Sequence, residues 1–188
     1  MKGSAKYLVL VIPVLALMAM PAMADNAFVG SKMCKKCHLK QHKSWGATAM
    51  ATAFESLKPG VKAEEKTAAG MDPEKDYTAD AACVGCHTTG YGMEGGFVSE
   101  ADTPDLMGVG CESCHGAGGA YMADEVHSLK KKDFTHAEVE AAGMIVKVGE
   151  AQCVACHNED NPNKADTFDF ATQGEEGVHE HYDLKYEH

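Results

Sequence analysis

The cysteines of this chain constrain its fold more than any other feature. All eight occur in four C-x-x-C pairs, and a histidine follows each pair directly. The four signatures are Cys34/Cys37/His38, Cys83/Cys86/His87, Cys111/Cys114/His115 and Cys153/Cys156/His157. Two thiols at this spacing can add to the two vinyl groups along one edge of a haem, and the histidine then becomes the proximal ligand of the iron. The pattern therefore predicts four covalently bound c-type haems.

Other uses of paired cysteines fit the pattern less well. Zinc ribbons need no histidine after each pair, and a thioredoxin-like motif would not recur four times. Four haems in residues 25–188 leave only about forty residues for each, too few for four separate protein cores. The porphyrins themselves should then form the core. We expect a single compact, mainly α domain with few short strands, its core formed by four packed haems.

The first 24 residues have the composition of a signal peptide. Lys2 and Lys6 precede an apolar run that ends at Met20, and the small-x-small sequence Ala22-Met23-Ala24 follows. An uncleaved membrane anchor is the alternative, although the run is shorter than the roughly 20 residues that a spanning helix needs. We expect residues 25–188 to be exported to the periplasm as a domain without a membrane span.

The charge of the chain is negative and unevenly distributed. The formal net charge is −11, with no arginine, which disfavours nucleic acid as a partner because its phosphates would repel the protein. Residues 25–66 carry eight lysines and four acidic residues, whereas residues 133–188 carry three lysines and thirteen acidic residues. The two ends could therefore steer different protein partners, or both could be ordinary solvated surfaces.

Signals for regular structure are mainly helical. Glycine and proline punctuate the chain, and residues 88–118 are rich in glycine and should be loop, apart from a possible strand at 96–99. A polar turn is expected at 158–164. The predicted helices span residues 38–57, 61–69, 121–132, 136–142 and 175 to the end.

Histidines outside the signatures are candidates for the sixth ligand of each iron. They are His42, His127, His136, His179, His181 and His188. On a helix His42 would share the face of His38, so it cannot cap the same haem and should be a surface residue. His179 and His181 are two residues apart, and on a helix only one could face a given iron. We expect His127 and one of this pair to bind iron, and His136 and His188 to be surface residues.

Long stretches of the chain resemble the cytochrome c-554 family of multihaem cytochromes. They read FESLKPGVK, MDPEKDYTADAACVGCHTTGYGMEGGF, GVGCESCHGAG and VHEHYDL. The resemblance implies a mainly helical fold with haems in stacked pairs that meet at a near-perpendicular contact. It also implies that His127 caps the first haem and His179 the fourth, on His157. The second haem, on His87, would then be five-coordinate, with an open distal face.

Met50 departs from the family pattern. In the family, a histidine in a sequence like SWxxxxH caps the third haem, on His115, and here the sequence SWGATAM places Met50 at that position. A thioether is a good haem ligand, and His/Met ligation raises the reduction potential relative to two histidines. The alternative is that Met50 only fills core, and that the third haem is open or capped by another side chain.

By resemblance, the function is electron transfer. The chain would accept electrons from hydroxylamine oxidoreductase or a similar multihaem enzyme and pass them to another cytochrome or a quinone-linked acceptor. An open haem on His87 could instead reduce a small molecule such as nitric oxide, although no distal catalytic acid is identifiable in the sequence. A subunit of an extracellular haem filament is a third possibility.

Overall fold

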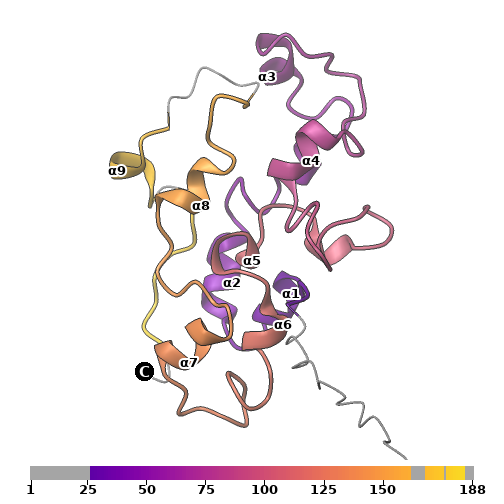
Figure 1. Cartoon of the computed structure of the whole chain (residues 1–188). Helices are drawn as coiled ribbons and strands as arrows, with labels where there is room; N and C mark the ends of the chain where they lie inside the picture. Colours follow the sequence, from indigo (N-terminus) through magenta and orange to yellow (C-terminus); the bar gives the residue numbers. More distant parts are fainter. Residues whose placement is uncertain (1–25, 162–167, 176, 185–188) are drawn as a thin grey trace, which may run out of the picture.

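The computed structural model describes residues 26–161, 168–175 and 177–184. Short helices joined by long irregular segments make up the described chain (Figure 1). The α-helices are α1 (Ser31–Cys34), α2 (Leu39–Trp45), α3 (Ala63–Ala68), α4 (Ala81–His87), α5 (Cys111–His115), α6 (Gly118–Tyr121), α7 (His136–Ala141), α8 (Glu150–Val154) and α9 (Phe170–Gln173). Two 3₁₀-helices are η1 (Phe54–Leu57) and η2 (Pro104–Leu106). The protein is therefore mainly α, as predicted.

Each haem signature begins in a short helix. Signatures two and three lie within α4 and α5, whereas α1 ends at Cys34 and α8 at Val154. One helical turn brings residues three apart onto one face, which is how both cysteines of a pair can reach the same porphyrin edge. The Asp80 carboxylate caps α4 by accepting a hydrogen bond from the Ala82 amide at 3.1 Å.

The helix predicted for residues 38–57 is interrupted. α2 ends at Trp45, and turns lead from there to η1. The Trp45 indole donates a hydrogen bond to the Val109 carbonyl at 2.9 Å, and the Val109 amide donates to the Met50 carbonyl at 2.9 Å. These contacts replace helical hydrogen bonds, so tertiary packing overrides local helix propensity here. Met50 consequently lies in a turn and not on the helix that carries His42.

The other predicted elements have mixed outcomes. Helices appear as α3 and α7 within the ranges predicted for them, and a capping box between Thr135 and Glu138 begins α7. The helix predicted for 121–132 is wrong, because α6 ends at Tyr121 and turns follow it. In one of these turns the Ser128 hydroxyl donates a hydrogen bond to the Asp124 carbonyl. The strand at 96–99 is also wrong: in the described residues, β pairing is limited to one bridge between Thr88 and Met107.

The C-terminal part differs most from its prediction. α9 precedes residue 175, where a helix was expected to begin, and residues 177–184 contain no helix. Turns occupy part of 158–161, as predicted, whereas residues 162–164 of the predicted turn lie outside the described residues. The predicted signal peptide lies outside them as well. No helix in the described ranges is long and apolar enough to span a bilayer.

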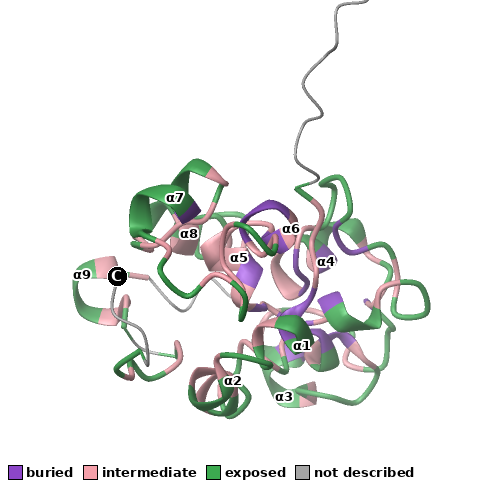
Figure 2. Ribbon diagram, turned by 90° about the horizontal axis from the view of Figure 1, so that it is seen from below, coloured by how far each residue is buried: buried purple, intermediate pink, exposed green. Residues whose placement is uncertain are grey.

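Protein side chains form a small core on one side of the molecule. Phe54, Leu57 and Tyr77 pack with Val84, Phe97 and Leu106, which joins η1 and α4 to the loops around them. In Figure 2 the buried residues form scattered patches, and much of the ribbon around α7, α8 and α9 is intermediate or exposed. So modest a side-chain core agrees with the expectation that porphyrins contribute much of the interior.

Candidate haem centres

Two pairs of imidazole rings face each other in the structure. The ring centroids of His38 and His127 are 5.8 Å apart, and those of His115 and His179 are 6.3 Å apart. Two imidazoles on opposite sides of one metal ion, with N–metal bonds of about 2 Å each, place their centroids roughly 6 Å apart. Both distances therefore suit an iron atom between the rings. His38 and His127 meet as the resemblance implied for the first haem.

Backbone carbonyls orient several of these rings. Nδ1 of His115 lies 2.8 Å from the Ile145 carbonyl oxygen, and Nδ1 of His179 lies 2.9 Å from that of Glu180. His87 Nδ1 lies 2.7 Å from the Ala53 carbonyl oxygen and 3.1 Å from the Ser56 hydroxyl. A proton on Nδ1, donated to these carbonyls, leaves the Nε2 lone pair for a metal.

The electrostatic surroundings also suit metal binding. Burial lowers the pKa of His38, and the imidazoles of His115 and His179 lower it further. Burial likewise lowers the pKa of His115. A lowered pKa keeps each ring neutral, which is the form that ligates iron.

His179 lies against a different signature from the one expected. Its ring faces His115 of the third signature, which favours the third haem over the fourth, on His157, as its partner. The reason is the path of residues 177–184, which run alongside α2: the Glu180 amide donates to the Ser44 hydroxyl at 2.8 Å, and Lys40 Nζ lies 5.6 Å from the centre of the Tyr182 ring. His179 thus lies on the side of His115 where Met50 was expected to cap the third haem.

His181 lies close to His179. Their ring centroids are 5.4 Å apart, in an edge-on arrangement. The expectation that only one of them could face a given iron assumed a helix, on which residues two apart diverge. In an extended chain, residues two apart point to the same side, so both rings can approach the same region.

The remaining histidines differ in their surroundings. In the described part of the chain, no ring contact is found for His87, and the ring of His157 stacks on Phe168 with centroids 4.6 Å apart. His42 packs edge-on against Trp45 at 5.2 Å, a contact within its own helix. His136 is exposed at the start of α7. His188 lies outside the described residues.

Thiols of different signatures meet in pairs. All eight cysteines are free of disulfide bonds. The nearby Cys111 thiol and burial raise the pKa of Cys34, and burial together with the nearby Cys86 thiol raises the pKa of Cys156. The first signature therefore adjoins the third, and the second adjoins the fourth. The free thiols and the facing rings together fit covalent haem.

Cys37 differs from the other signature cysteines in its exposure. It is exposed, whereas the other seven signature cysteines are partly buried. The reason is local: α1 ends at Cys34, and residues 35–37 form a turn in which the Cys37 amide donates to the Cys34 carbonyl at 3.2 Å. Lys35 and Lys36 of the same turn are also exposed. Cys37 thus lies at the surface, and its bond to the first haem stays a prediction that places one haem edge there.

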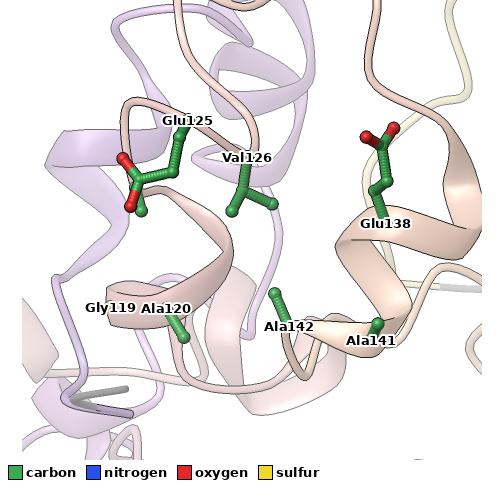
Figure 3. Close-up of a pocket in the computed structure, with 8 residues that line it drawn as sticks. Gly119, Ala120, Glu125, Val126, Glu138, Ala141 and Ala142 are labelled. Carbon is green, nitrogen blue, oxygen red and sulfur yellow. The ribbon is translucent and has the colours of Figure 1, made fainter. Parts of the chain in front are cut away.

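A cavity of about 540 Å³ lies between α6 and α7 (Figure 3). It is lined by Gly119, Ala120, Ala123, Glu125, Val126, Glu138, Ala141 and Ala142. In the close-up, the small apolar side chains border the space, and the Glu125 and Glu138 carboxylates lie on its two sides. Val126, which lines the cavity, directly precedes His127 in the sequence.

Sequence reasoning missed one buried group near the signatures. Glu112, between the two cysteines of the third signature, is 3% exposed. Its carboxylate accepts hydrogen bonds from three backbone amides, those of Val29, Gly30 and Gly118. The glycines at 110, 116 and 118 could have indicated this burial. They surround the third signature and allow other backbone segments to approach it closely.

The chain is similar to known cytochromes. A family model described as cytochrome c554 and c-prime matches residues 33–116. Cytochrome c-554 of Nitrosomonas europaea is 45% identical over 138 residues, which are 71% of this chain. The chain spans 59% of the length of that curated relative.

A solved structure is similar over most of the chain. The reduced state of cytochrome c554 from Nitrosomonas europaea superimposes with a TM-score of 0.71 at 39% sequence identity, over 85% of this chain and 88% of that one. Mostly helical structure with almost no strands is common to both, which confirms the predicted fold class. Proteins of this family carry covalently bound c-type haem, in agreement with the Cys-x-x-Cys-His signatures. The chain therefore belongs to the cytochrome c554 family.

Proposed function

We propose that this chain is a periplasmic tetrahaem electron carrier. When bound, each haem iron supplies a one-electron Fe(III)/Fe(II) couple. The observation that carries the proposal is the contact between the first and third signatures, where the Cys111 amide donates a hydrogen bond to the Ser31 hydroxyl of α1 at 3.3 Å. Haems attached to neighbouring signatures would lie close together, and electrons pass readily between haems in contact. Residues 25–188 would form the carrier domain after removal of the signal peptide.

The axial ligands follow from the facing rings. We assign His38 and His127 to the first haem, and His115 and His179 to the third. His87 would hold the second haem with its other face open. With His179 assigned to the third haem, the fourth haem, on His157, loses the cap that the resemblance implied, and we propose Met50 as its ligand instead.

Replacing Met50 with alanine tests that ligand. A thioether ligand gives ferric haem a weak charge-transfer band at the red end of its visible spectrum, and the band should be present in the native protein and absent from Met50→Ala. Met144→Ala removes another half-buried methionine and should leave the band unchanged. A native spectrum without the band, unaltered in Met50→Ala, would rule out methionine ligation.

A group of lysines marks a candidate docking surface. Lys32, Lys35, Lys36, Lys40 and Lys43 are all exposed on or near α1 and α2, and no acidic residue lies between positions 31 and 45. Lys35 and Lys36 stand within the first signature, beside the exposed Cys37, so a partner bound there would lie close to its haem. We propose that an acidic multihaem donor, such as a hydroxylamine-oxidoreductase-like enzyme, binds at this lysine surface. A second cytochrome or a quinone-linked acceptor would then take the electrons.

The rate of reduction by such a donor tests this assignment. In stopped-flow mixing with hydroxylamine oxidoreductase, the second-order rate constant should fall as ionic strength rises, because salt screens attraction between opposite charges. The double variant Lys35→Glu/Lys36→Glu should react several-fold more slowly at low salt and converge with the native protein at high salt. Matched changes at Lys130 and Lys132, which lie on another loop, should have a much smaller effect. Salt-independent rates, identical in all variants, would refute docking at the lysine surface.

Reduction of a small molecule at the second haem is a second candidate. It is favoured by His87, for which the described residues provide no facing imidazole and whose Nδ1 bonds a neutral carbonyl. Catalytic turnover of nitric oxide with a chemical reductant, at a rate far above that of free haem, would support an enzyme. Stoichiometric binding without turnover would leave the carrier with an open site.

A further inference from the structure

The buried carboxylate of Glu112 lies where the first and third signatures meet. Its Oε1 accepts hydrogen bonds from the Val29 amide at 2.9 Å and the Gly118 amide at 2.6 Å, and its Oε2 accepts from the Gly30 amide at 2.7 Å. Three donors and no proton acceptor form the pattern of an ionised carboxylate. In the described residues, no lysine or histidine forms an ion pair with it.

Both haem attachments lie within the reach of this charge. Glu112 is next to Cys111 in α5, and Gly30, one of its donors, caps the start of α1, with its carbonyl oxygen 4.0 Å from the Cys34 sulfur. Glu112 also acts on its neighbours through its charge. The pKa of Tyr121 is raised mainly by burial, and the nearby Glu112 carboxylate raises it further. Removed from water, a charge acts over longer distances than it would on the surface.

The packing around the carboxylate is close. A Cβ atom at Gly118 would stand 2.9 Å from Glu112 Oε1 and 2.7 Å from Val29 Cγ2, so any larger residue there would force these two side chains to shift. The carboxylate thus connects three segments: the chain entering α1, the signature helix α5 and the start of α6. Replacement of the side chain would affect both the position of these segments and the local electrostatic field.

We propose that Glu112 is a positioning residue that fixes the first and third haems relative to each other, and that its buried negative charge lowers the reduction potentials of both. A negative charge near the iron stabilises the ferric over the ferrous state. This inference rests on the proposed tetrahaem carrier. Lower reduction potentials at the first and third haems would favour electron transfer from them to the second and fourth haems.

A spectroelectrochemical titration of the holoprotein tests the inference. Glu112→Gln keeps the side-chain shape and the Oε1 acceptor but removes the charge. We expect the midpoint potentials of two haems to shift upward while the other two stay close to their native values. Glu64→Gln removes an exposed carboxylate on α3 and should leave all potentials unchanged. Glu112→Asp keeps the charge while shortening the side chain, so its potentials should stay much nearer to native values than those of Glu112→Gln.

The outcomes separate this inference from the proposed function. Native potentials in Glu112→Gln, or equal shifts in the Asp and Gln variants, would overturn the electrostatic role. Failure of the Gln variant to incorporate haem, with native potentials in an intact Asp variant, would support the role of the carboxylate in holding the segments together. A native protein with fewer than four haems by mass spectrometry would instead contradict the tetrahaem carrier itself.

Discussion

Replacing His179 with alanine is expected to convert one low-spin haem to the high-spin state. The native ring faces His115 with centroids 6.3 Å apart, and an iron between them would have two strong-field imidazole ligands. Removal of one imidazole leaves a weaker ligand or an open position, so one ferric low-spin signal should be lost from the electron paramagnetic resonance spectrum. The same haem should gain the ability to bind external imidazole or carbon monoxide.

The neighbouring His181 decides how this experiment is designed. Its ring is 5.4 Å from that of His179 and could take its place as a ligand. The double variant His179→Ala/His181→Ala removes both rings and is the decisive sample, whereas His181→Ala alone should keep the native spectrum. His136→Ala serves as a control for loss of an exposed histidine. An unchanged low-spin count in the double variant would contradict the assignment of His179 to the third haem.

Replacing Phe54 with alanine should destabilise the protein by about 3–5 kcal/mol, the range typical for loss of a buried aromatic side chain. Phe54 is 1% exposed, and its ring centroid lies 5.5 Å from that of Phe97. A typical protein is stable by only about 5–15 kcal/mol in total, so this loss would be large. Since η1 also carries the Ser56 hydroxyl and adjoins the Ala53 carbonyl, the spectrum of the second haem should change as well.

Urea denaturation followed by tyrosine and tryptophan fluorescence and by haem absorption would measure this loss. Leu39→Ala is the matched control, because Leu39 is 61% exposed and its removal should change the free energy of unfolding by less than about 0.5 kcal/mol. A loss below about 1 kcal/mol in Phe54→Ala would mean that the side-chain cluster around η1 and α4 contributes little to stability.

Attachment chemistry was predictable because it depends on local sequence. Two thiols and a histidine at fixed spacing react with one porphyrin whatever the rest of the chain does, and the short helices α4 and α5 reproduce the spacing directly. How far each thiol is covered was not predictable, since the exposure of Cys37 depends on where α1 ends and on which segments pack nearby. Helices α3 and α7 were predictable because their breakers and caps, such as Thr135 with Glu138, lie next to them in the sequence.

Contacts between distant segments were not predictable in this way. The interruption after Trp45 depends on a hydrogen bond to Val109, 64 residues away. Residues 177–184 lie alongside α2 because the Glu180 amide reaches Ser44, 136 residues away, and this contact brings His179 to His115. Helix propensity alone favoured a C-terminal helix. The extended path depends on tertiary packing, which single-sequence propensity does not contain.

Electron paramagnetic resonance of the fully ferric holoprotein, with spin quantification against total haem, tests the ligand assignment most directly. Facing imidazoles at His38/His127 and His115/His179, with thioether ligation at the fourth haem, predict three low-spin haems. An open position on His87 predicts one high-spin haem. A spectrum with only high-spin haem, or with no high-spin component, would contradict the proposed arrangement of ligands.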